Sequence, residues 1–549
     1  MTGRTRQSVG VGIDRYDAVV VGAGFAGMYS LYRLRQLGFT ALAYDAADDV
    51  GGTWWWNRYP GARCDIESLD YSYSFSPELE QEWNWTERYA TQPEILRYAA
   101  HVADRFDLRR HIDFGTRVVA AAYQDDDRRW RVHTDRGQPD TDRGQSVSAQ
   151  FLVMAVGALS TPKRPEITGI DAFAGPTYHT ASWPHEGVDF GGRRVGVIGT
   201  GSSGIQAIPL IAEQAEHLTV FQRTANFSTP ARNAPLDRDV VAARKADAKQ
   251  HRARARASRA GVVVELGEGC AVDAEPGERE RRFRAGWEQG SLFGVPTSFA
   301  DLLLDRRSNE LAAEFLRRRI DEIVEDSVVA EALSPTSYPF ATKRPCLDTG
   351  YFETFNRRDV TLVDLRSTPI VEVDDTGVRT ADLHHELDVL VFATGFDAMT
   401  GPLLAIDPVG RDGLTLRQKW ADGARTYLGL ATAGFPNLFT VTGPGSPSVL
   451  TNMIMAIEQH VEWITDCMSA MRGDGRSTIE ADVDAEDGWV DHVNDVGNIT
   501  LYPLADSWYM GANVPGKPRV FLPYVGGLDL YGQICDGVAA DGYKGFTIT

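Results

Sequence analysis

Two stretches of the chain repeat the same order of hydrophobic and polar positions. Residues 16–38 read YDAVVVGAGFAGMYSLYRLRQLG, a short apolar run, a glycine turn and then apolar residues at helical spacing. Residues 193–214 read RRVGVIGTGSSGIQAIPLIAEQ and have the same pattern. A second apolar run follows each stretch, at residues 41–47 and 218–223. These patterns predict two β-strand–helix–β-strand units, and therefore an α/β protein.

The pattern changes between residues 230 and 335. This stretch is rich in Ala, Arg and Glu, has helical spacing and contains few β-branched runs, so it predicts a helical insertion. Its two basic runs, at residues 251–260 and 277–286, are expected to form solvated surface. Two strand-like runs and then an apolar helix are predicted later in the chain, over residues 360–365, 388–397 and 450–464.

The first glycine turn has the spacing of a dinucleotide-binding fingerprint. Gly22, Gly24 and Gly27 form GxGxxG between a predicted strand and a predicted helix. Glycine permits the tight turn, the approach of a pyrophosphate and the close packing of helix on strand, and the helix N-terminus carries partial positive charge. Asp45 ends the next predicted strand, where a carboxylate accepts hydrogen bonds from a ribose diol and repels a 2′-phosphate. This unit is therefore predicted to bind FAD or NAD.

The second glycine turn has the same spacing but a different residue at the end of the following strand. Gly199, Gly201 and Gly204 form its GxGxxG, and Arg223 stands where the first unit has its acidic residue. A guanidinium can hold a 2′-phosphate with charge-assisted hydrogen bonds, and the hydroxyl of Thr224 can add a donor. This unit is predicted to bind NADPH. Two different dinucleotides in one chain imply electron transfer from nicotinamide to flavin.

The order of these segments predicts two Rossmann-like dinucleotide-binding domains, each built from two parts of the chain, with a helical insertion in the second. The segment at 388–397 resembles the ATG segment by which two-dinucleotide flavoproteins return to their FAD domain. The expected division is 1–155 and 385–549 for the FAD-binding domain, 156–229 and 336–384 for the NADPH-binding domain, and 230–335 for the insertion.

Composition excludes several classes of function. The chain has 549 residues, of which 43% are hydrophobic and 24% charged, which is typical of a globular protein. Its net charge of −20 repels phosphate backbones, so nucleic acid is not an expected partner. The N-terminus lacks the apolar core of a signal peptide, and no run of about 18 apolar residues indicates a membrane span. A monomer is expected, and a homodimer stays open.

The five cysteines carry little chemistry of their own. They show neither CxxC pairing nor metal-ligand spacing, so no metal site is expected. A sparse, odd set is consistent with a reducing cytoplasm. Disulfide reductases need a cysteine pair close in sequence, and Cys64 stands alone. The reduced flavin is therefore expected to react with oxygen.

Two further motifs identify a family. The segment 173–184, FAGPTYHTASWP, resembles the FxGxxxHxxxWP signature of Baeyer–Villiger monooxygenases, and 52–65 resembles their GxWxxxxYPGxxxD pattern. The resemblance runs from about Tyr16 to the C-terminus, and the C-terminal third is most similar to the members that act on phenylacetone and on steroids. One departure is Asp45, where the family usually has Glu; a shorter carboxylate still reaches the ribose.

The resemblance implies an enzyme that uses FAD, NADPH and O₂ to convert a small-molecule ketone into an ester or lactone, through a C4a-peroxyflavin and a Criegee intermediate. The developing negative charge needs a fixed cation in a dry site. The segment ATKRP puts Arg344 at the position of the family's active-site arginine, and Asp65 at that of its partner. Arginine stays charged at working pH, so it stabilises an anion and does not act as a base.

The family's other functional positions carry over residue by residue. Gly52, Thr53, Trp54, Tyr59, Asp65 and Asn452 are expected at FAD. Thr200, Lys343, Arg344 and Trp508 are expected at NADP. Phe173, Gly175, His179 and Trp183 are expected on a linker that couples domain motion, and His179 is not expected to be a base. Ser448, Val449, Leu450 and Met453 are expected to line the substrate site.

Two alternatives remain open. The first is a flavin monooxygenase that oxygenates sulfur or nitrogen, which Trp183 and the Asp65–Arg344 pair argue against as the main activity. The second is a non-catalytic flavin-binding sensor or an uncoupled oxidase.

Overall fold

The computed structural model describes residues 13–136 and 146–549. Within them the first sheet has seven strands: β1 (Asp14–Val21), β2 (Ala41–Tyr44), β3 (Ile112–Asp113), β4 (Val118–Gln124), β5 (Arg129–Thr134), β6 (Ser146–Met154) and β17 (Leu438–Thr440). Their order is β3-β2-β1-β6-β5-β4, and β17 pairs with β6. The strands are parallel apart from the antiparallel pairs β4–β5 and β5–β6. The sequence TDRGQ occurs at residues 134–138 and again at 141–145, between β5 and β6, and lies mostly outside the described residues.

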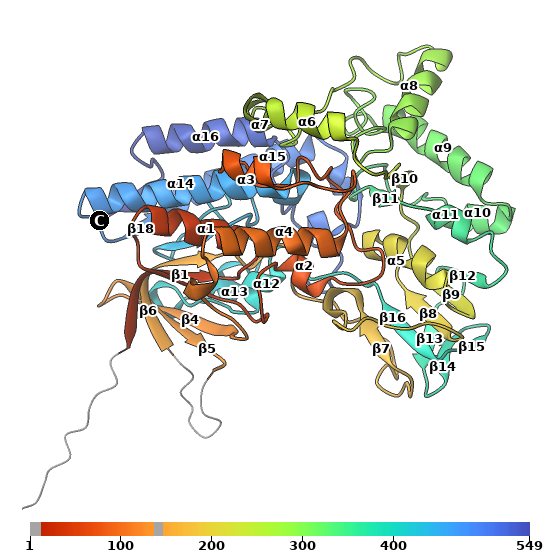
Figure 1. The fold of residues 1–549 in the computed structure, drawn as a ribbon, viewed down its shortest axis with the longest axis horizontal. Helices are drawn as coiled ribbons and strands as arrows, with labels where there is room; N and C mark the ends of the chain where they lie inside the picture. The colour runs from red at the N-terminus through yellow and green to blue at the C-terminus, as the bar shows by residue number, and fades with distance from the viewer. Residues whose placement is uncertain (1–12, 137–145) are drawn as a thin grey trace, which may run out of the picture.

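Helices cover one face of this sheet. They include α1 (Phe25–Gln36), α4 (Gln92–Arg105) and α14 (Met453–Gly473). Figure 1 shows α14 running alongside α16 (Leu528–Ala540) above the sheet. The side chains of β1 alternate between two cores: Ala18 and Val20 face the helices, whereas Val19 and Val21 pack against the other face. Alternation along a strand explains how one apolar run supplies both cores.

The second sheet is parallel throughout. Its strands are β7 (Thr177–His179), β8 (Arg194–Ile198), β9 (His217–Gln222), β12 (Val360–Asp364) and β16 (Val389–Phe392). Their order is β12-β9-β8-β16-β7. The helices α5 (Ser202–Ala212) and α11 (Tyr351–Thr354) pack on one face. A small antiparallel sheet, β13 (Ile370–Val373), β14 (Gly377–Thr380) and β15 (His384–Glu386), packs on the other. The two expected Rossmann-like units are confirmed.

The division between the domains needs one correction. The expected return to the FAD-binding domain at residue 385 comes too early, because β16 pairs in parallel with β8 and β7 of the second sheet. The chain therefore leaves this sheet only after Phe392. The residues of a buried apolar strand do not indicate which of two sheets the strand joins, so the sequence pattern could not locate this domain boundary.

The region between the two parts of the second sheet is helical. It contains α6 (Arg238–Ala246), α7 (Ala248–Arg256), α8 (Pro276–Gln289), α9 (Arg306–Ile323) and α10 (Ser327–Leu333). The strands β10 (Ser228–Pro230) and β11 (Cys346–Asp348) pair in parallel at its base. In Figure 1, α8 and α9 reach away from both sheets, whereas α6 and α7 lie over the first domain.

The remaining elements are short connections and the C-terminal part. They are α2 (Thr53–Trp56), α3 (Pro77–Glu82), α12 (Gly401–Leu404), α13 (Leu416–Lys419), β18 (Ile479–Ala481), α15 (Val483–Asn498) and β19 (Phe546–Ile548). β18 and β19 pair in antiparallel fashion and fasten the C-terminus to the first domain. None of the described helices is long and apolar enough to cross a bilayer.

Candidate active site

Each glycine turn brings the end of a strand against the start of a helix. Gly22 has φ +107°, and a Cβ there would lie 2.5 Å from the carbonyl oxygen of Ala155. Gly199 has φ +112°, and its Cβ would lie 2.4 Å from the oxygen of Ala393. Both positions therefore require glycine. The third glycine of each motif allows the helix to pack on its own turn: a Cβ on Gly27 would lie 1.8 Å from the oxygen of Gly22.

Asp45 holds the first turn. Its two carboxylate oxygens accept hydrogen bonds from the backbone N–H groups of Ala23, at 2.5 Å, and Ala47, at 2.8 Å. Burial raises the pKa of Asp45, and these two backbone donors oppose the shift. Each oxygen keeps a second lone pair, which can accept a ribose hydroxyl. The shorter side chain thus fixes the glycine loop and still offers acceptors to a nucleotide.

Cationic and hydroxyl groups gather at the second turn. The Thr200 hydroxyl donates to the carbonyl of Thr224 at 3.1 Å, which ties the glycine loop to the end of β9. The Nζ of Lys343 lies 4.5 Å from the centre of the Tyr338 ring. Burial, and secondarily the charge of Arg223, lowers the pKa of Lys343. A site that holds two such cations close together is suited to an anion.

Arg344 and Asp65 meet although 279 positions separate them. The guanidinium Nε donates to one carboxylate oxygen at 2.5 Å and the Nη2 to the other at 2.8 Å, a bidentate pair. The Nη1 donates to the carbonyl of Val449 at 2.6 Å. Burial lowers the pKa of Arg344, but the Asp65 carboxylate outweighs this effect and the pKa lies above its ordinary value. The guanidinium is therefore a fixed cation.

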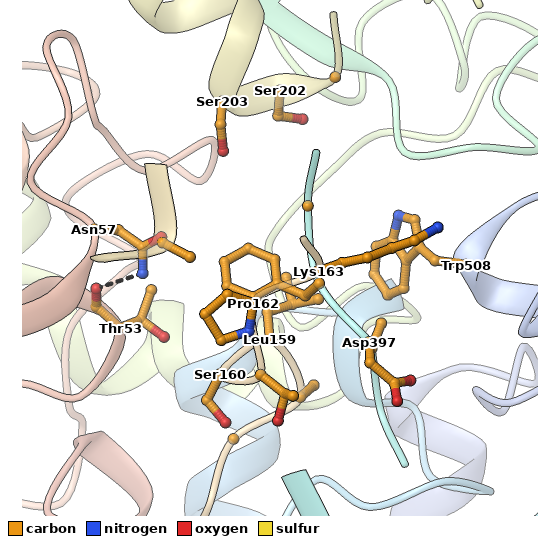
Figure 2. A pocket seen from close by; sticks show the side chains of 18 of the residues that line it. Thr53, Asn57, Leu159, Ser160, Pro162, Lys163, Ser202, Ser203, Asp397 and Trp508 are labelled. Carbon is orange, nitrogen blue, oxygen red and sulfur yellow. Dashed lines mark hydrogen bonds between the residues drawn. The ribbon is translucent and has the colours of Figure 1, made fainter. Parts of the chain in front are cut away.

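The ends of both glycine turns open into one cavity of about 1920 Å³. A pocket for one small ligand measures roughly 300–1,000 Å³, so this cavity has room for two dinucleotides. Figure 2 shows side chains from several segments around it, including Thr53 and Asn57 at α2, Ser202 and Ser203 at α5, and Trp508. The expected residues that line it are Gly22, Gly24, Asp45, Gly52, Thr53, Trp54, Tyr59, Asp65, Gly199, Thr200, Gly201, Arg223, Thr224, Lys343, Arg344, Val449, Met453 and Trp508.

Gly27 and Gly204 pack each helix on its own turn and do not line the cavity, and three further residues expected at this site lie behind the lining. The Ser448 side chain is fully buried, and its hydroxyl donates to the carbonyl of Thr442 at 3.1 Å. Leu450 is half-buried against the main core. The Asn452 amide donates to the carbonyl of Asp70 at 2.8 Å, and its oxygen accepts from the backbone N–H of Ile454, which caps α14. Both ends of the Asn452 side chain are thus engaged with protein.

The four residues expected on the linker, Phe173, Gly175, His179 and Trp183, also lie outside the lining. Phe173 and Trp183 are buried in apolar clusters on the second domain. The Nδ1 of His179 accepts from the N–H of Ala181 at 3.0 Å, so its Nε2 carries the proton and donates to Thr394, at 3.2 Å. Burial lowers the pKa of His179. The imidazole is therefore neutral, and its two hydrogen bonds have a structural role.

The sequence reasoning missed several cavity residues. Lys163 follows β6, lines the cavity, and donates through Nζ to the carbonyl of Asn513. Burial and the charge of Arg223 lower its pKa. Tyr71 lines the wall beside Trp54, whose indole N–H donates to the Tyr71 hydroxyl at 3.1 Å. The pair Lys163-Arg164 between Pro162 and Pro165, in the segment that follows β6, was a signal in the sequence, whereas Tyr71 had none.

Two glycine turns that face one cavity, and a bidentate arginine–carboxylate pair in the lining of that cavity, define the class of two-dinucleotide oxidoreductases. All five cysteines are free, and the described ranges contain no group of three side chains placed to hold a metal ion. The family model for pyridine nucleotide-disulphide oxidoreductases matches residues 19–237, which span the first glycine turn and the second.

Full-length relatives narrow the class. The chain is 42% identical to a Baeyer–Villiger monooxygenase of Pseudooceanicola batsensis, and the alignment covers 98% of this chain and 97% of the relative. It is 40% identical to an acetone monooxygenase of Gordonia sp., with 97% of this chain and 99% of the relative covered. It is also 40% identical to a phenazine N-monooxygenase of Lysobacter antibioticus, with 97% of each chain covered. Its fold matches an oxidized steroid monooxygenase bound to NADP with a TM-score of 0.92 and 51% identity (97% and 99%). It matches a cyclohexanone monooxygenase from Rhodococcus sp. bound to NADP⁺ with a TM-score of 0.95 and 44% identity (98% and 100%). The chain belongs to the Baeyer–Villiger monooxygenase family, as the sequence motifs predicted.

Proposed function

We propose that this protein is an FAD-dependent Baeyer–Villiger monooxygenase that uses NADPH and O₂ to convert a ketone into an ester or lactone. The observation that carries the proposal is the Arg344–Asp65 pair, which puts a fixed, partly buried cation in a cavity shared by both glycine turns. Baeyer–Villiger oxygenation develops negative charge, and a preorganised cation in such a site stabilises it. Family membership over nearly the whole chain supports the same activity.

The cofactors are assigned by the chemistry of the two turns. FAD fits the first turn, where Gly22 and Gly24 leave room for a pyrophosphate and the Asp45 carboxylate would accept a ribose hydroxyl. NADPH fits the second turn, where Arg223, Thr224 and Lys343 suit a 2′-phosphate. When bound, FAD accepts hydride from NADPH and activates O₂. The expected domain division follows, with the correction that the NADPH-binding domain extends to Phe392.

The chain's own residues have three roles in this proposal. Arg344 holds positive charge beside the reacting atoms, and Asp65 fixes the plane of its guanidinium through two hydrogen bonds. Val449 and Met453 present a wall to the ketone. The half-buried His179, at the end of β7, contacts Thr394 in the segment that follows β16, and we propose that this contact helps to couple the positions of the domains.

The decisive experiment supplies the purified holoenzyme with NADPH, ¹⁸O₂ and a panel of aryl, cyclic and steroidal ketones. We expect an ester or lactone that carries one ¹⁸O atom. NADPH oxidation without a labelled ester from any ketone, under conditions where flavin stays bound, would sink the proposal. An uncoupled oxidase would give that result, whereas a non-catalytic sensor would give neither NADPH oxidation nor ester, so the panel also tests both parts of this alternative.

A second candidate is oxygenation of nitrogen or sulfur. The 40% identity to a phenazine N-monooxygenase is the observation that favours it. A panel of paired ketones and thioethers, extended with an aromatic N-heterocycle, separates the two. Sulfoxide or N-oxide as the sole product would make heteroatom oxygenation the main activity.

Location and assembly remain predictions from the sequence. The five free cysteines are consistent with a reducing compartment, and we propose that this compartment is the cytoplasm. A monomer is expected, with a homodimer as the alternative, and gel filtration with light scattering distinguishes the two.

A further inference from the structure

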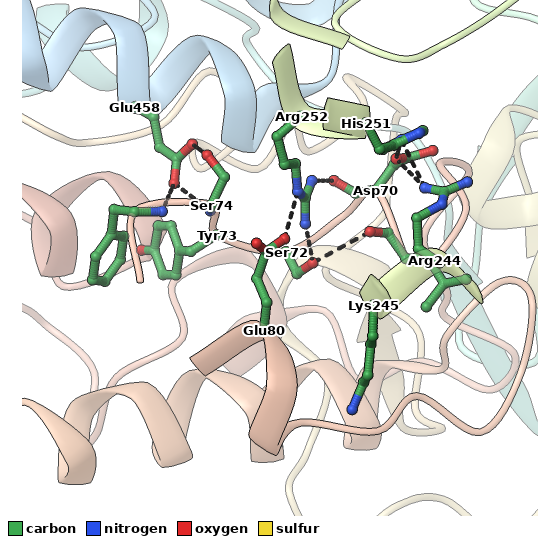
Figure 3. A network of polar contacts seen from close by, with 12 residues as sticks. Asp70, Ser72, Tyr73, Ser74, Glu80, Arg244, Lys245, His251, Arg252 and Glu458 are labelled. Carbon is green, nitrogen blue, oxygen red and sulfur yellow. Dashed lines mark hydrogen bonds and ion pairs between the residues drawn. The ribbon is translucent and has the colours of Figure 1, made fainter. Parts of the chain in front are cut away.

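The segment 70–75 separates the cavity from the helical insertion. Tyr71 faces the cavity beside Trp54, and the Tyr73 hydroxyl donates to the carbonyl of Phe25 at the start of α1. The alternate residues face the other way. Ser72 contacts α7, and the backbone N–H and hydroxyl of Ser74 both donate to Glu458 on α14, as Figure 3 shows. This segment is therefore a wall with a catalytic side and a braced side.

Arg252 on α7 makes three contacts on the braced side (Figure 3). Its Nε donates to the Glu80 carboxylate at 2.7 Å, its Nη2 to the Ser72 hydroxyl at 2.7 Å, and its Nη1 to the carbonyl of Asp70 at 3.1 Å. The exposed fraction of the side chain is 9% for Arg252 and 12% for Glu80. Each nitrogen of the guanidinium thus has a separate partner. Arg252 therefore holds segment 70–75 at two points, the Asp70 carbonyl and the Ser72 hydroxyl, and joins it to Glu80.

His251 adds a second tie to the same segment. Its Nε2 lies 2.6 Å from the Asp70 carboxylate, which also receives an Nη1 hydrogen bond from Arg244 at 2.8 Å. Because a carboxylate can only accept, the Nε2 of His251 carries the proton and donates to Asp70. The run at 251–260 was expected to be solvated, but His251 and Arg252 are buried. The sequence pattern missed this because their partners are about 180 positions earlier in the chain.

The braced wall continues to the reactive part of the cavity. The Asp70 carbonyl that receives Arg252 also receives the Asn452 amide, and Asn452 caps α14 immediately after the short turn that contains Val449. The Val449 carbonyl accepts from Arg344. Asp65, the other partner of Arg344, precedes Asp70 by five residues on the same stretch. Two partners of Arg344, Asp65 and Val449, therefore lie within a few residues of atoms that Arg252 and its neighbours hold.

We infer that Arg252 and His251 of the helical insertion are positioning residues for oxygenation, which act through Asp70 and Asn452 on the two partners of Arg344. That the positioned site performs oxygenation rests on the proposed function, whereas the path from Arg252 and His251 to Arg344 rests on the hydrogen bonds described above. A buried charge that loses its partner is costly, so the paired groups Arg252–Glu80 and His251–Asp70 keep one arrangement. The insertion thereby gives the cavity wall a fixed shape without touching substrate.

The test compares Arg252→Met with Arg254→Met in the FAD-loaded full-length protein. Arg254 lies on the same helix but pairs with Asp247 at the surface, where 54% of its side chain is exposed, so it is a matched control. We expect Arg252→Met, which removes all three hydrogen bonds, to raise the KM for ketone or lower the yield of ester per NADPH by about tenfold, a change equivalent to the free energy of about one charge-assisted hydrogen bond. The KM for NADPH and the FAD content stay at their wild-type values. Arg254→Met matches the wild type in all of these measurements.

A readout that needs no turnover accompanies the kinetics. The visible circular dichroism of bound FAD reports the asymmetry of the wall around the flavin, and we expect it to change in Arg252→Met and not in Arg254→Met. If Arg252→Met does not retain FAD, Arg252→Lys decides. Lysine keeps the charge but has a single nitrogen in place of the fork, so we expect an effect of the same sign and smaller size.

Three results would overturn the inference: Arg252→Met or Arg252→Lys with wild-type kinetics and flavin spectrum, equal effects in the Arg254→Met control, or a loss confined to thermal stability with unchanged ester yield per bound FAD. Failure of the proposed function looks different. In that case the wild type itself makes no ester, while the flavin spectrum of the variants still reports whether Arg252 fixes the wall.

Discussion

The ion pair between Arg344 and Asp65 allows catalysis and stability to be separated by one set of variants. Arg344→Ala removes three hydrogen bonds: two to the Asp65 carboxylate and one to the carbonyl of Val449. It also leaves that carboxylate without its counter-charge, in a site where 22% of its side chain is exposed. The variant therefore has a cost for folding and a separate cost for the reaction.

The cost for folding follows from the exposure of the pair. Removing one partner of a fully buried ion pair costs about 3–5 kcal/mol, whereas exposed pairs contribute about 0–1 kcal/mol. At roughly one-fifth exposure we expect Arg344→Ala to lower the free energy of unfolding by about 2–3 kcal/mol. The double variant Arg344→Ala/Asp65→Ala leaves no lone charge, so we expect it to recover about half of that loss or more.

The cost for the reaction does not recover. Loss of one preorganised group that stabilises developing negative charge typically lowers the rate by about 10²–10³-fold. We expect Arg344→Ala to lose ester formation by at least this factor while FAD stays bound. The double variant lacks the same cation and should be as inactive as the single variant. Stability and activity thus diverge along the series, which a purely structural role for Arg344 would not produce.

The assay measures both quantities on the same FAD-loaded preparations. Urea unfolding gives the free energy, and ester formation normalised to bound flavin gives the activity. Asp65→Ala completes the double-mutant cycle and gives the coupling energy of the pair. Ester formation by Arg344→Ala at the wild-type rate would refute the catalytic role, and a double variant less stable than either single variant would refute the calculation of the folding cost.

Three further predictions concern the nucleotide sites and the response to pH. Arg223→Ala should raise the KM for NADPH with little change for NADH, measured by steady-state kinetics with both; an unchanged preference would contradict the assignment of the 2′-phosphate. Gly22→Ala should abolish FAD retention, read from the absorbance of the purified protein, because its Cβ would lie 2.5 Å from the Ala155 oxygen; Gly38→Ala, where φ is also positive but nothing lies within 4 Å, is the control. Burial lowers the pKa of His460 from 6.5 to about 3, so the unfolded chain binds a proton in this range that the folded protein excludes. Stability should therefore fall by about 1.4 kcal/mol per unit as pH decreases from about 6.5 to 3, and His460→Gln should flatten that slope in urea titrations at several pH values.

Local pattern explains why the sequence predicted so much of this fold. The apolar runs before Gly22 and Gly199 became β1 and β8, and the helices after them became α1 and α5. A glycine turn is dictated by the backbone within a few residues, so its place in the chain is enough to identify it. The motif at 173–184 likewise identified the family without the fold, because it depends on residue identity alone.

The domain boundary and the shape of the cavity depended on contacts distant in sequence. β16 could have joined either sheet, and only its pairing with β8 decided between them. Asn452 was expected at the flavin, but its amide and its oxygen are both engaged with protein behind the wall. The local pattern around Asn452 gave no sign that Asp70, nearly four hundred positions earlier, would be its partner.

The sequence by itself determined the chemistry that the chain carries: two unlike nucleotide turns, an arginine and a carboxylate, and the residues of one family's motifs. The tertiary structure decided which of these groups meet. Arg344 and Asp65 form a bidentate pair because β11 and the segment after α2 converge on one cavity. Two residues of the basic run on α7, His251 and Arg252, became a buried brace because their counter-charges come from the first domain. Residue types and short-range spacing are local, whereas the burial and pairing of charges arise only when segments far apart in the chain pack together.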